Sequence, residues 1–491
     1  MSTGGRLRVV VIGAGFGGLG AAVALRRGGI TEVTVLERAD DVGGVWRENT
    51  YPGAACDVPS ALYSWSWAPN PDWPRRYSPQ ADILGYIERV ARETGIRDSV
   101  ITGTSVTALR YDDATHVWTV TAEGPDGVRT YEAELVVSAV GQLSAPVVPS
   151  LPGREAFAGP AFHSAEWRHD VDLRGRRVAV VGTGASAIQF VPGIADDAAH
   201  ITVFQRSAPY VIPKPDGPRV RVQRAALRRI PGLQRLERRA VFWLTEQMNR
   251  ALTEETWLKG LIHRWWRMHL RRTIADPALR DALQPDYELG CKRVLFSNTW
   301  YRTLARDHVD VVTDDVAALE ADGVRTRDGV LHEADVVIWG TGFAATDFLR
   351  GIDVTGRDGA RLADVWADGA FAHLGVSVPG FPGLAVVYGP NTNLGGSSII
   401  GMMEAQSAYV VQLAQAMTQG RIVSPEVRAD VAAAYDREMQ ERLGTSVWAR
   451  CDSWYRTASG RVSTNWPGMV AEYQRRLSQL DLGDFVDAAA S

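Results

Sequence analysis

Two glycine-rich turns, 169 positions apart, each follow a short apolar run of the kind that forms a buried parallel strand. The first turn reads Gly13-Ala-Gly15-Phe-Gly17-Gly18 and the second reads Gly182-Thr-Gly184-Ala-Ser186-Ala187. A helix-forming stretch and a second apolar run follow each turn. Glycines let the backbone turn sharply and approach a pyrophosphate, whose charge meets the N-terminus of the helix. The chain is therefore predicted to be an α/β protein with two Rossmann-like dinucleotide-binding domains.

The residue at the end of each unit indicates which nucleotide it binds. Glu37 lies 19 residues after Gly18, close to the spacing of a carboxylate that hydrogen-bonds an adenosine ribose. The second unit has Arg206 and Ser207 at this place, and an arginine suits the additional 2′-phosphate of NADP. The alternative is a surface arginine at a strand end. We predict FAD in the first unit and NADPH, rather than NADH, in the second, with hydride passing from NADPH to FAD.

At 491 residues the chain is too long for one ordinary domain. Apolar runs at 135–140 and 335–339 are predicted to close the two nucleotide-binding sheets. The predicted parts are a FAD-binding domain at 1–150 and 340–491, an NADP-binding domain at 151–217 and 281–339, and a helical subdomain at 218–280. Residues 340–491 also contain the C-terminal loops and helices, and the helical subdomain is an insert in the NADP-binding domain.

The segment from Pro218 to Ala275 is basic and contains tryptophans. Apolar residues at helical spacing in it are Leu258, Leu261, Ile262 and Trp265. We favour a helical subdomain that packs on the NADP-binding domain and shapes substrate access. The alternative is contact with a membrane surface, because arginines are interleaved with apolar residues near the start of the segment. These arginines are Arg219, Arg221, Arg224, Arg228 and Arg229.

The composition restricts the class of protein. Hydrophobic residues make up 45% and charged residues 22%, which is typical of a globular cytosolic protein. A formal net charge of -4 gives no general attraction to nucleic acid or anionic lipid. The uncharged stretch at 9–25 is short and rich in glycine, and no secretory signal precedes it. We expect a cytoplasmic protein with no metal site and with neither nucleic acid nor a membrane as partner.

The three cysteines, Cys56, Cys291 and Cys451, are far apart in the sequence and form no CxxC pair. We therefore expect neither a disulfide framework nor a redox dithiol, in agreement with a reducing cytoplasm. A disulfide reductase is excluded on the same ground, because it would need a dithiol to receive flavin electrons.

Several longer motifs resemble those of Baeyer-Villiger monooxygenases. Residues 157–167 match all four fixed positions of the family fingerprint FxGxxxHxxxW, although Arg168 follows where the family commonly has Pro or Asp. A second family signature, from Gly43 to Asp57, is also complete. Further matches lie at 290–293, 389–395, 451–455 and 464–468. The resemblance covers nearly the whole chain.

The resemblance implies an enzyme that uses FAD, NADPH and dioxygen to convert a ketone to an ester or lactone. In this family, dioxygen adds to the reduced flavin, and the resulting C4a-peroxyflavin attacks the ketone carbonyl. Arg293 is expected to stabilise both this peroxide and the anionic tetrahedral intermediate, since an arginine keeps its charge. Asp57 is expected to orient Arg293 as its catalytic partner. The alternative role of Asp57 is to cap a turn.

The glycine turns and the resemblance together give the predicted cofactor-binding residues. Those expected near FAD are Gly13, Gly15, Gly18, Glu37, Val45, Trp46, Asp57, Tyr63 and Val106. Those expected near NADP or the nicotinamide are Thr183, Gly184, Ser186, Gln189, Arg206, Ser207, Lys292, Arg293 and Trp454. Lys292 would join Arg206 at the 2′-phosphate, unless the two basic residues at 292–293 are merely solvated, and Trp454 would lie on a mobile loop. His163 of the fingerprint is expected to be structural.

Two other functions stay open. An N- or S-oxygenating flavin-containing monooxygenase would use the same peroxide in its protonated form, but it usually ends the fingerprint with another aromatic residue. A non-oxygenating electron carrier or sensor would bind FAD and NADPH and give no oxygenated product. The complete motifs favour the ketone reaction, while the ketone itself and the oligomeric state are not predicted.

Overall fold

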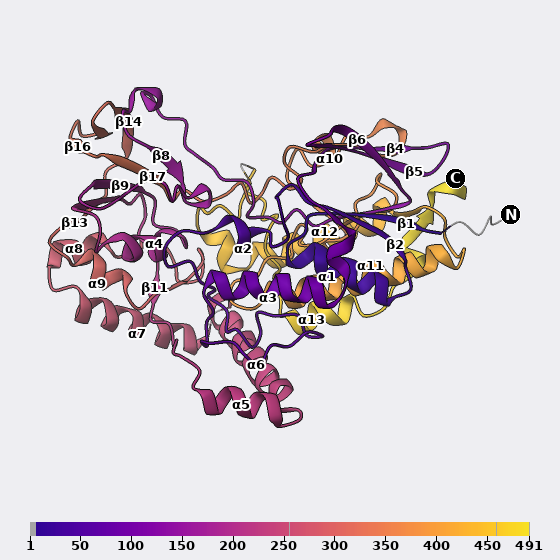
Figure 1. The fold of residues 1–491 in the computed structure, drawn as a ribbon, viewed down its shortest axis with the longest axis horizontal. Coiled ribbons are helices and arrows are strands. Elements are labelled where there is room, and N and C mark those ends of the chain that lie inside the picture. The colour runs from indigo at the N-terminus through magenta and orange to yellow at the C-terminus, as the bar shows by residue number, and fades with distance from the viewer. Residues whose placement is uncertain (1–5, 255, 458, 491) are drawn as a thin grey trace.

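The first of two large parallel sheets combines strands from the N-terminal part of the chain with one strand from far along it (Figure 1). The computed structural model describes residues 6–254, 256–457 and 459–490. In spatial order, the five parallel strands of this sheet are β19 (Leu384–Val386), β7 (Leu135–Ser138), β1 (Arg8–Ile12), β2 (Glu32–Leu36) and β3 (Val100–Ile101). The strand nearest the N-terminus is thus central, and a strand from far along the chain completes the sheet.

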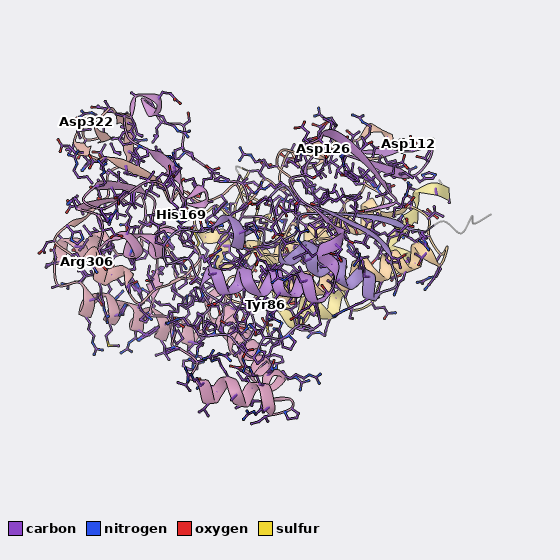
Figure 2. All side chains as sticks on the ribbon, viewed as in Figure 1. Tyr86, Asp112, Asp126, His169, Arg306 and Asp322 are labelled. Atoms are coloured by element: carbon purple, nitrogen blue, oxygen red, sulfur yellow. A yellow bond between two sulfur atoms is a disulfide. The ribbon has the colours of Figure 1, made fainter. Side chains whose placement is uncertain are left out.

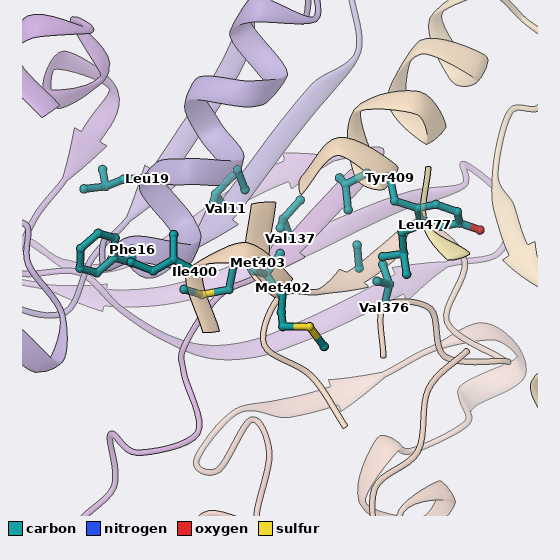
Figure 3. Close-up of a cluster of buried hydrophobic side chains, with 14 of the residues drawn as sticks. Val11, Phe16, Leu19, Val137, Val376, Ile400, Met402, Met403, Tyr409 and Leu477 are labelled. Carbon is teal, nitrogen blue, oxygen red and sulfur yellow. The ribbon is translucent and has the colours of Figure 1, made fainter. Parts of the chain in front are cut away.

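Side chains of β1 alternate between two hydrophobic cores, as the period of a strand requires. Val9 and Val11 face the core that includes α1 (Phe16–Arg27) and α11 (Ile399–Thr418). Figure 3 shows this core, where Val11 and Val137 lie near Phe16 of α1 and Met403 of α11. Val10 and Ile12 face a second core under a four-stranded sheet of β18 (Asp353–Thr355), β4 (Ser105–Asp112), β5 (Val117–Gly124) and β6 (Gly127–Ala133).

The second large sheet is also parallel. Its spatial order is β13 (Val309–Val312), β10 (His200–Phe204), β9 (Arg177–Val181), β17 (Val336–Trp339) and β8 (Ala161–His163). One face packs on α4 (Ala187–Ile194) and α9 (Trp300–Leu304), and the other on a small antiparallel sheet of β14 (Val316–Glu320), β15 (Gly323–Thr326) and β16 (Leu331–Glu333). The predicted α/β class with two Rossmann-like parallel sheets is confirmed.

The family fingerprint forms the edge of the second sheet and the link to the first. A Cβ atom at Gly159 would overlap the carbonyl oxygen of Asp335, so glycine is required there. Trp167 packs its ring 5.5 Å from that of Phe190 on α4. The ring of His163 accepts a hydrogen bond from the backbone of Ala165, as expected for a structural histidine.

In its described residues, which leave out position 255, the insert has four helices between the paired strands β11 (Val211–Ile212) and β12 (Leu295–Phe296). These are α5 (Arg221–Arg229), α6 (Leu233–Thr253), α7 (Trp257–Thr273) and α8 (Pro277–Ala282). Ile262, Trp266 and Leu270 of α7 are buried in the core of the second sheet, so this side of the insert packs against the protein. Leu261 and Trp265, which share the predicted helical spacing, are exposed instead.

The expectation that the cysteines form no disulfide was wrong. Cys291 and Cys451 are joined, with their Cα atoms 6.2 Å apart and 160 positions between them in sequence. The fold brings the segment after the insert against the C-terminal loops, and sequence spacing carries no information about such a meeting. Cys56 is free and buried. The bond therefore ties the loop before Lys292 and Arg293 to the loop that carries Trp454.

The remaining helices surround the first sheet. They are α2 (Val45–Glu48), α3 (Gln80–Glu93), α10 (Leu362–Val365), α12 (Ala429–Gly444) and α13 (Val470–Arg476). Near the C-terminus, β20 (Pro425–Val427) pairs with β21 (Phe485–Asp487). No helix in the described ranges is long and apolar enough to cross a membrane.

Candidate active site

At the first glycine turn, the N-terminus of the following helix is free to bind an anion. Gly13 has a φ of +100°, and a Cβ atom at Gly18 would overlap the carbonyl oxygen of Gly13, so neither position accepts a side chain. Helix α1 begins after Gly15, which provides no side-chain cap, and has no acidic residue in its first turn. The unpaired N–H groups of such a turn attract a pyrophosphate.

Glu37 is buried at the end of β2, beside this turn. Its carboxylate accepts hydrogen bonds from the backbone N–H of Ala14, at 2.6 Å, and from that of Ala39, at 2.9 Å. The backbone carbonyl of Glu37 accepts from Thr104, two residues before the buried Val106 on β4. The structure thus brings Glu37 and Val106 together at one end of the predicted FAD site.

The second family signature lies against the first glycine turn. A Cβ atom at Gly15 would come 3.5 Å from the Cα of Gly44, so the two segments approach closely. Val45 and Trp46 follow on α2. The indole N–H of Trp46 donates to the hydroxyl of Tyr63 at 3.1 Å. These predicted flavin neighbours therefore form one aromatic wall.

The second glycine turn has the same local form. Gly182 has a φ of +103°, and α4 starts after Ser186 with no side-chain cap and no acidic residue in its first turn. Thr183, between Gly182 and Gly184, donates its hydroxyl to the carbonyl of Ser207 at 3.3 Å. This hydrogen bond links the turn to the end of β10.

Gln189 of α4 is engaged with the first nucleotide fold. Its side-chain oxygen accepts from the hydroxyl of Tyr51 at 3.1 Å and from the backbone of Ala55 at 3.2 Å, while its amide donates to the carbonyl of Ala55 at 3.0 Å. Nearby, the hydroxyl of Thr50 and the ring of His169 are 2.9 Å apart, and Figure 2 labels His169 where the two folds meet. The residue predicted at the pyrophosphate here bridges the two folds.

Basic residues gather after β10. The ammonium of Lys292 donates to the hydroxyl of Ser207 at 3.2 Å and lies 4.5 Å from the ring centre of Tyr287. Burial lowers the pKa of Lys292, and the positive charge of Arg206 lowers it further. Arg206 itself is exposed. Of the three residues predicted at the 2′-phosphate, Lys292 and Ser207 are thus hydrogen-bonded, and Arg206 is near enough to lower the pKa of Lys292.

The predicted catalytic pair is in contact. A guanidinium nitrogen of Arg293 lies 3.9 Å from a carboxylate oxygen of Asp57, whose side chain is 7% exposed, while that of Arg293 is 41% exposed. Burial works against the charged guanidinium, but Asp57, with smaller contributions from Tyr455, Tyr388 and Cys56, offsets it, and the pKa of Arg293 is raised. Arg293 therefore stays protonated at any working pH and keeps an accessible face.

Lys214 is a site residue that the sequence did not reveal. Its ammonium donates to the carbonyl of Cys56 at 2.6 Å and lies 3.4 Å from the second carboxylate oxygen of Asp57. The backbone N–H and carbonyl of Lys214 each hydrogen-bond to the side-chain amide of Asn298. The side chain is 10% exposed. Only its place between Pro213 and Pro215, which stiffen the backbone, could have drawn attention to it.

Tyrosines complete the surroundings of Arg293. Burial raises the pKa of Tyr388 to about 12, although the charge of Arg293 opposes this. Its hydroxyl donates to Asn393 at 2.9 Å. Tyr455 is fully buried and touches the ring of Trp454, at 4.1 Å between centres. Trp454 is half-exposed on the loop that starts at Cys451. The hydroxyls near Arg293 are thus neutral donors and acceptors.

These features define a class of protein with two dinucleotide-binding folds and a fixed guanidinium–carboxylate pair where they meet. The family model for flavin-binding monooxygenase-like proteins matches residues 6–276. A Baeyer-Villiger monooxygenase of Streptomyces coelicolor is 44% identical over 483 residues, which are 98% of this chain and 92% of the relative. The chain belongs to the flavin-binding monooxygenase-like family and is a homologue of Baeyer-Villiger monooxygenases.

Solved structures agree with this placement. Cyclohexanone monooxygenase from Rhodococcus sp. Phi1 bound to NADP⁺ is 28% identical, with a TM-score of 0.86 over 96% of both chains. An oxidised steroid monooxygenase bound to NADP is 30% identical, with a TM-score of 0.84 over 96% of this chain and 97% of that one. The shared fold therefore extends to nearly the whole chain.

Proposed function

We propose that the chain is an NADPH- and FAD-dependent Baeyer-Villiger monooxygenase that converts a ketone to an ester or lactone. The contact between Asp57 and Arg293 carries the proposal, because it sets a permanent, accessible cation between the two nucleotide folds. The names of the relatives, and the NADP complexes of the two solved structures, support the reaction and the nucleotide. Bound FAD, once reduced by NADPH, would activate dioxygen, of which one atom would enter the ester or lactone and the other would leave as water.

The residues present fit the two nucleotides. The uncapped start of α1 and the buried Glu37 suit the pyrophosphate and ribose of FAD. Arg206, Ser207 and Lys292 offer two cations and a hydroxyl to the 2′-phosphate of NADPH. Trp46 and Tyr63 would border the flavin. Each of the two folds thus offers side chains and backbone groups that suit one of the two nucleotides.

Arg293 would act on the substrate oxygen. A ketone oxygen gains negative charge as its carbon is attacked, and a guanidinium already held in place stabilises that charge without reorganisation. Asp57 and Lys214 would set the direction in which Arg293 points. Tyr388 stays neutral at working pH, so it adds no competing negative charge.

Labelled dioxygen tests the reaction. Purified protein with NADPH and a panel of cyclic, linear, aromatic and polycyclic ketones should give an ester or lactone that contains one labelled oxygen atom, seen by mass spectrometry. A panel of amines and sulfides is the comparison. Rapid NADPH oxidation with no product from any ketone would instead assign the chain to non-oxygenating carriers, and N- or S-oxides alone to the N- or S-oxygenases.

Arg293→Ala tests the role of the cation. We expect it to bind FAD and to be reduced by NADPH, while ester formation falls by at least a factor of about 100, the usual cost of removing one oxyanion-stabilising group. Arg302→Ala, an exposed arginine on α9, is the matched control and should behave as the wild type. Unimpaired ketone oxygenation by Arg293→Ala would reject the proposed role.

A further inference from the structure

The insert holds most of the chain's exposed large apolar side chains. Seventeen such side chains are exposed in the described ranges, and ten of them lie between positions 220 and 268. They are Val220, Val222, Ile230, Leu236, Trp243, Leu244, Trp257, Leu261, Trp265 and Met268. A segment this short would hold few of them if they were scattered evenly, so the apolar surface is concentrated on the insert.

On α7 the exposed apolar side chains follow one side of the helix. Trp257, Leu261, Trp265 and Met268 recur every three or four residues, and Trp257 is 78% exposed. The opposite side, with Ile262, Trp266 and Leu270, is buried against the second sheet. The neighbouring helix α6 also exposes large apolar side chains, those of Leu236, Trp243 and Leu244. We call these exposed sides, together with α5, the insert face.

Cations without partners share the insert face. Residues 218–275 contain 14 Lys and Arg but only four Asp and Glu, although the whole chain has a formal net charge of -4. Five of the cations are in ion pairs. The side chains of the others make no hydrogen bond or ion pair to any described residue: Arg221, Arg224, Arg229, Arg235, Arg239, Arg264, Arg267, Arg271 and Arg272. The last four line a shallow hollow of about 350 Å³.

We propose that the insert face docks on the surface of an anionic lipid bilayer. Arginines without acidic partners attract anionic headgroups, while tryptophan and leucine side chains enter the boundary between headgroups and acyl chains. Because the inner side of α7 is buried in the protein, the helix lies in the plane of the surface. Helices α5, α6 and α7 lie along the lower side of the molecule in Figure 1.

The charge and the apolar side chains of the insert face favour a lipid bilayer over a second copy of the chain or a nucleic acid. Two copies of the chain that met through this face would bring nine unpaired arginines against nine more, which opposes association. A nucleic acid would satisfy the arginines but would leave the aliphatic side chains of Leu236, Leu244 and Leu261 against phosphates. A bilayer surface provides both the anions and the apolar layer.

The insert face lies across α6 from the proposed flavin site. On the inner side of α6, Arg238 donates to the carbonyls of Ala61 and Ser64, next to Tyr63. Further along, the hydroxyl of Thr245 is 3.3 Å from that of Ser397. Docking would therefore set the site one helix away from the lipid. If the site has the proposed function, on which this consequence rests, its favoured substrates are ketones that partition into lipid.

Vesicle co-sedimentation tests the docking. The holoprotein should sediment with vesicles in which one lipid in four is phosphatidylglycerol and the rest phosphatidylcholine, and far less with pure phosphatidylcholine. High salt should weaken this binding. No catalytic turnover is involved, so failure of this test is distinct from failure of the proposed function.

Two variants separate the charge from the apolar contribution. Replacement of Arg264, Arg267, Arg271 and Arg272 by Gln, and separately of Trp257 and Trp265 by Ser, should each lower affinity for the anionic vesicles by a factor of roughly ten or more. The control removes the same charge from exposed arginines elsewhere, by Gln at Arg129, Arg174, Arg327 and Arg350, and should bind as the wild type. Flavin content and circular dichroism verify folding.

Three results would overturn the proposal. The first is no preference for anionic over neutral vesicles. The second is binding that the tryptophan variant retains and that duplex DNA displaces, which marks a general polyanion surface. The third is self-association in sedimentation velocity that the tryptophan variant abolishes, which assigns the insert face to a second copy of the chain.

Discussion

The two carboxylate oxygens of Asp57 lie near different cations. One is 3.4 Å from Lys214 and the other is 3.9 Å from Arg293, and the carboxylate is nearly shielded from solvent. Lys214 is held through its backbone by Asn298 and is itself buried, whereas Arg293 keeps an exposed face. Lys214 is therefore a positioning residue: it holds Asp57, and Asp57 holds Arg293.

Lys214→Met should disturb this arrangement without removing Arg293. The carboxylate would be left with one cation and would draw Arg293 toward itself, away from a bound ketone. We expect kcat for ester formation to fall about tenfold, with more of the electrons from NADPH reducing dioxygen to hydrogen peroxide, and little change in the KM for NADPH. Lys214→Arg should restore much of kcat. Equal losses in Lys214→Met and Lys214→Arg, with loss of FAD, would indicate a purely structural role.

Lys292 should give NADPH binding a dependence on pH. Its pKa is lowered by burial, so as pH rises it loses its charge before an ordinary lysine would, and the attraction to the 2′-phosphate weakens. The KM for NADPH should therefore rise at alkaline pH below the ordinary lysine pKa, while the KM for NADH stays flat. In Lys292→Arg the rise should disappear, because a guanidinium remains protonated. Identical profiles for wild type and Lys292→Arg would contradict this account.

At the scale of elements, the disulfide between Cys291 and Cys451 joins the loop that precedes Arg293 to the loop that carries Trp454. Trp454 lies three residues beyond that tie. The loop predicted to be mobile therefore has one fixed end, and any movement of Trp454 must take place beyond Cys451.

Removal of the disulfide should lower stability and change the thiol count. Closing a loop with 160 positions between its ends stabilises the folded state by up to about 5 kcal/mol in the chain-entropy model. Cys291→Ser, Cys451→Ser and the double variant should all lower the thermal midpoint by the same amount, since each removes one bond. Unfolded without reductant, the wild type should expose one thiol, that of Cys56. Three thiols before reduction would contradict the disulfide.

The longer elements could be predicted from the sequence, and the shorter ones could not. The strand Glu32–Leu36 after the first glycine turn and the helix Ala187–Ile194 after the second are the apolar run and the helix-forming stretch expected there. The run at 135–140 forms a strand only to Ser138, since the chain then turns toward the glycine loop. Strands of two or three residues, such as β3 and β19, have no period and exist only because a neighbouring strand pairs with them.

For the site, the motifs could indicate the pairs but not their geometry. Asp57 and Arg293 stand in recognisable motifs, so their contact could be expected. Lys214 lies in no motif, and the amide of Gln189 makes contacts with the other fold that only the assembled structure reveals. The exposed side of α7 was likewise hidden, because spacing shows that a helix has an apolar stripe but not which stripe is covered.

At the scale of the whole molecule, the two nucleotide folds meet through backbone packed closely on backbone. Gly193 of α4 lies so near Pro52 that a Cβ atom there would be 2.9 Å from the carbonyl oxygen of Pro52. Gly53 approaches the carbonyl of Gln189 in the same way, at 2.8 Å. The relative placement of the folds therefore depends on the absence of side chains at this contact.

Gly193→Ala should push the folds apart by a small amount. Since hydride transfer requires the nicotinamide to reach the flavin, we expect reduction of the bound flavin by NADPH to slow several-fold in stopped-flow measurements, with FAD content unchanged. Gly85→Ala is the matched control, because a Cβ atom at Gly85 on α3 would meet nothing within 4 Å. Equal reduction rates in both variants would show that the contact can yield without consequence.

The position of β19 in the first sheet also determines the order in which a new chain can fold. The second sheet has all its strands once residue 339 has been synthesised, while the first must wait for Leu384–Val386 to pair with β7 and for α11 to cover α1. Until then the N-terminal strands leave the ribosome with an open edge and an uncovered apolar face, a state that favours aggregation. The N-terminal segment is thus synthesised first but is among the last to finish folding. During synthesis it avoids aggregation only if something else covers its open strand edge and its apolar face.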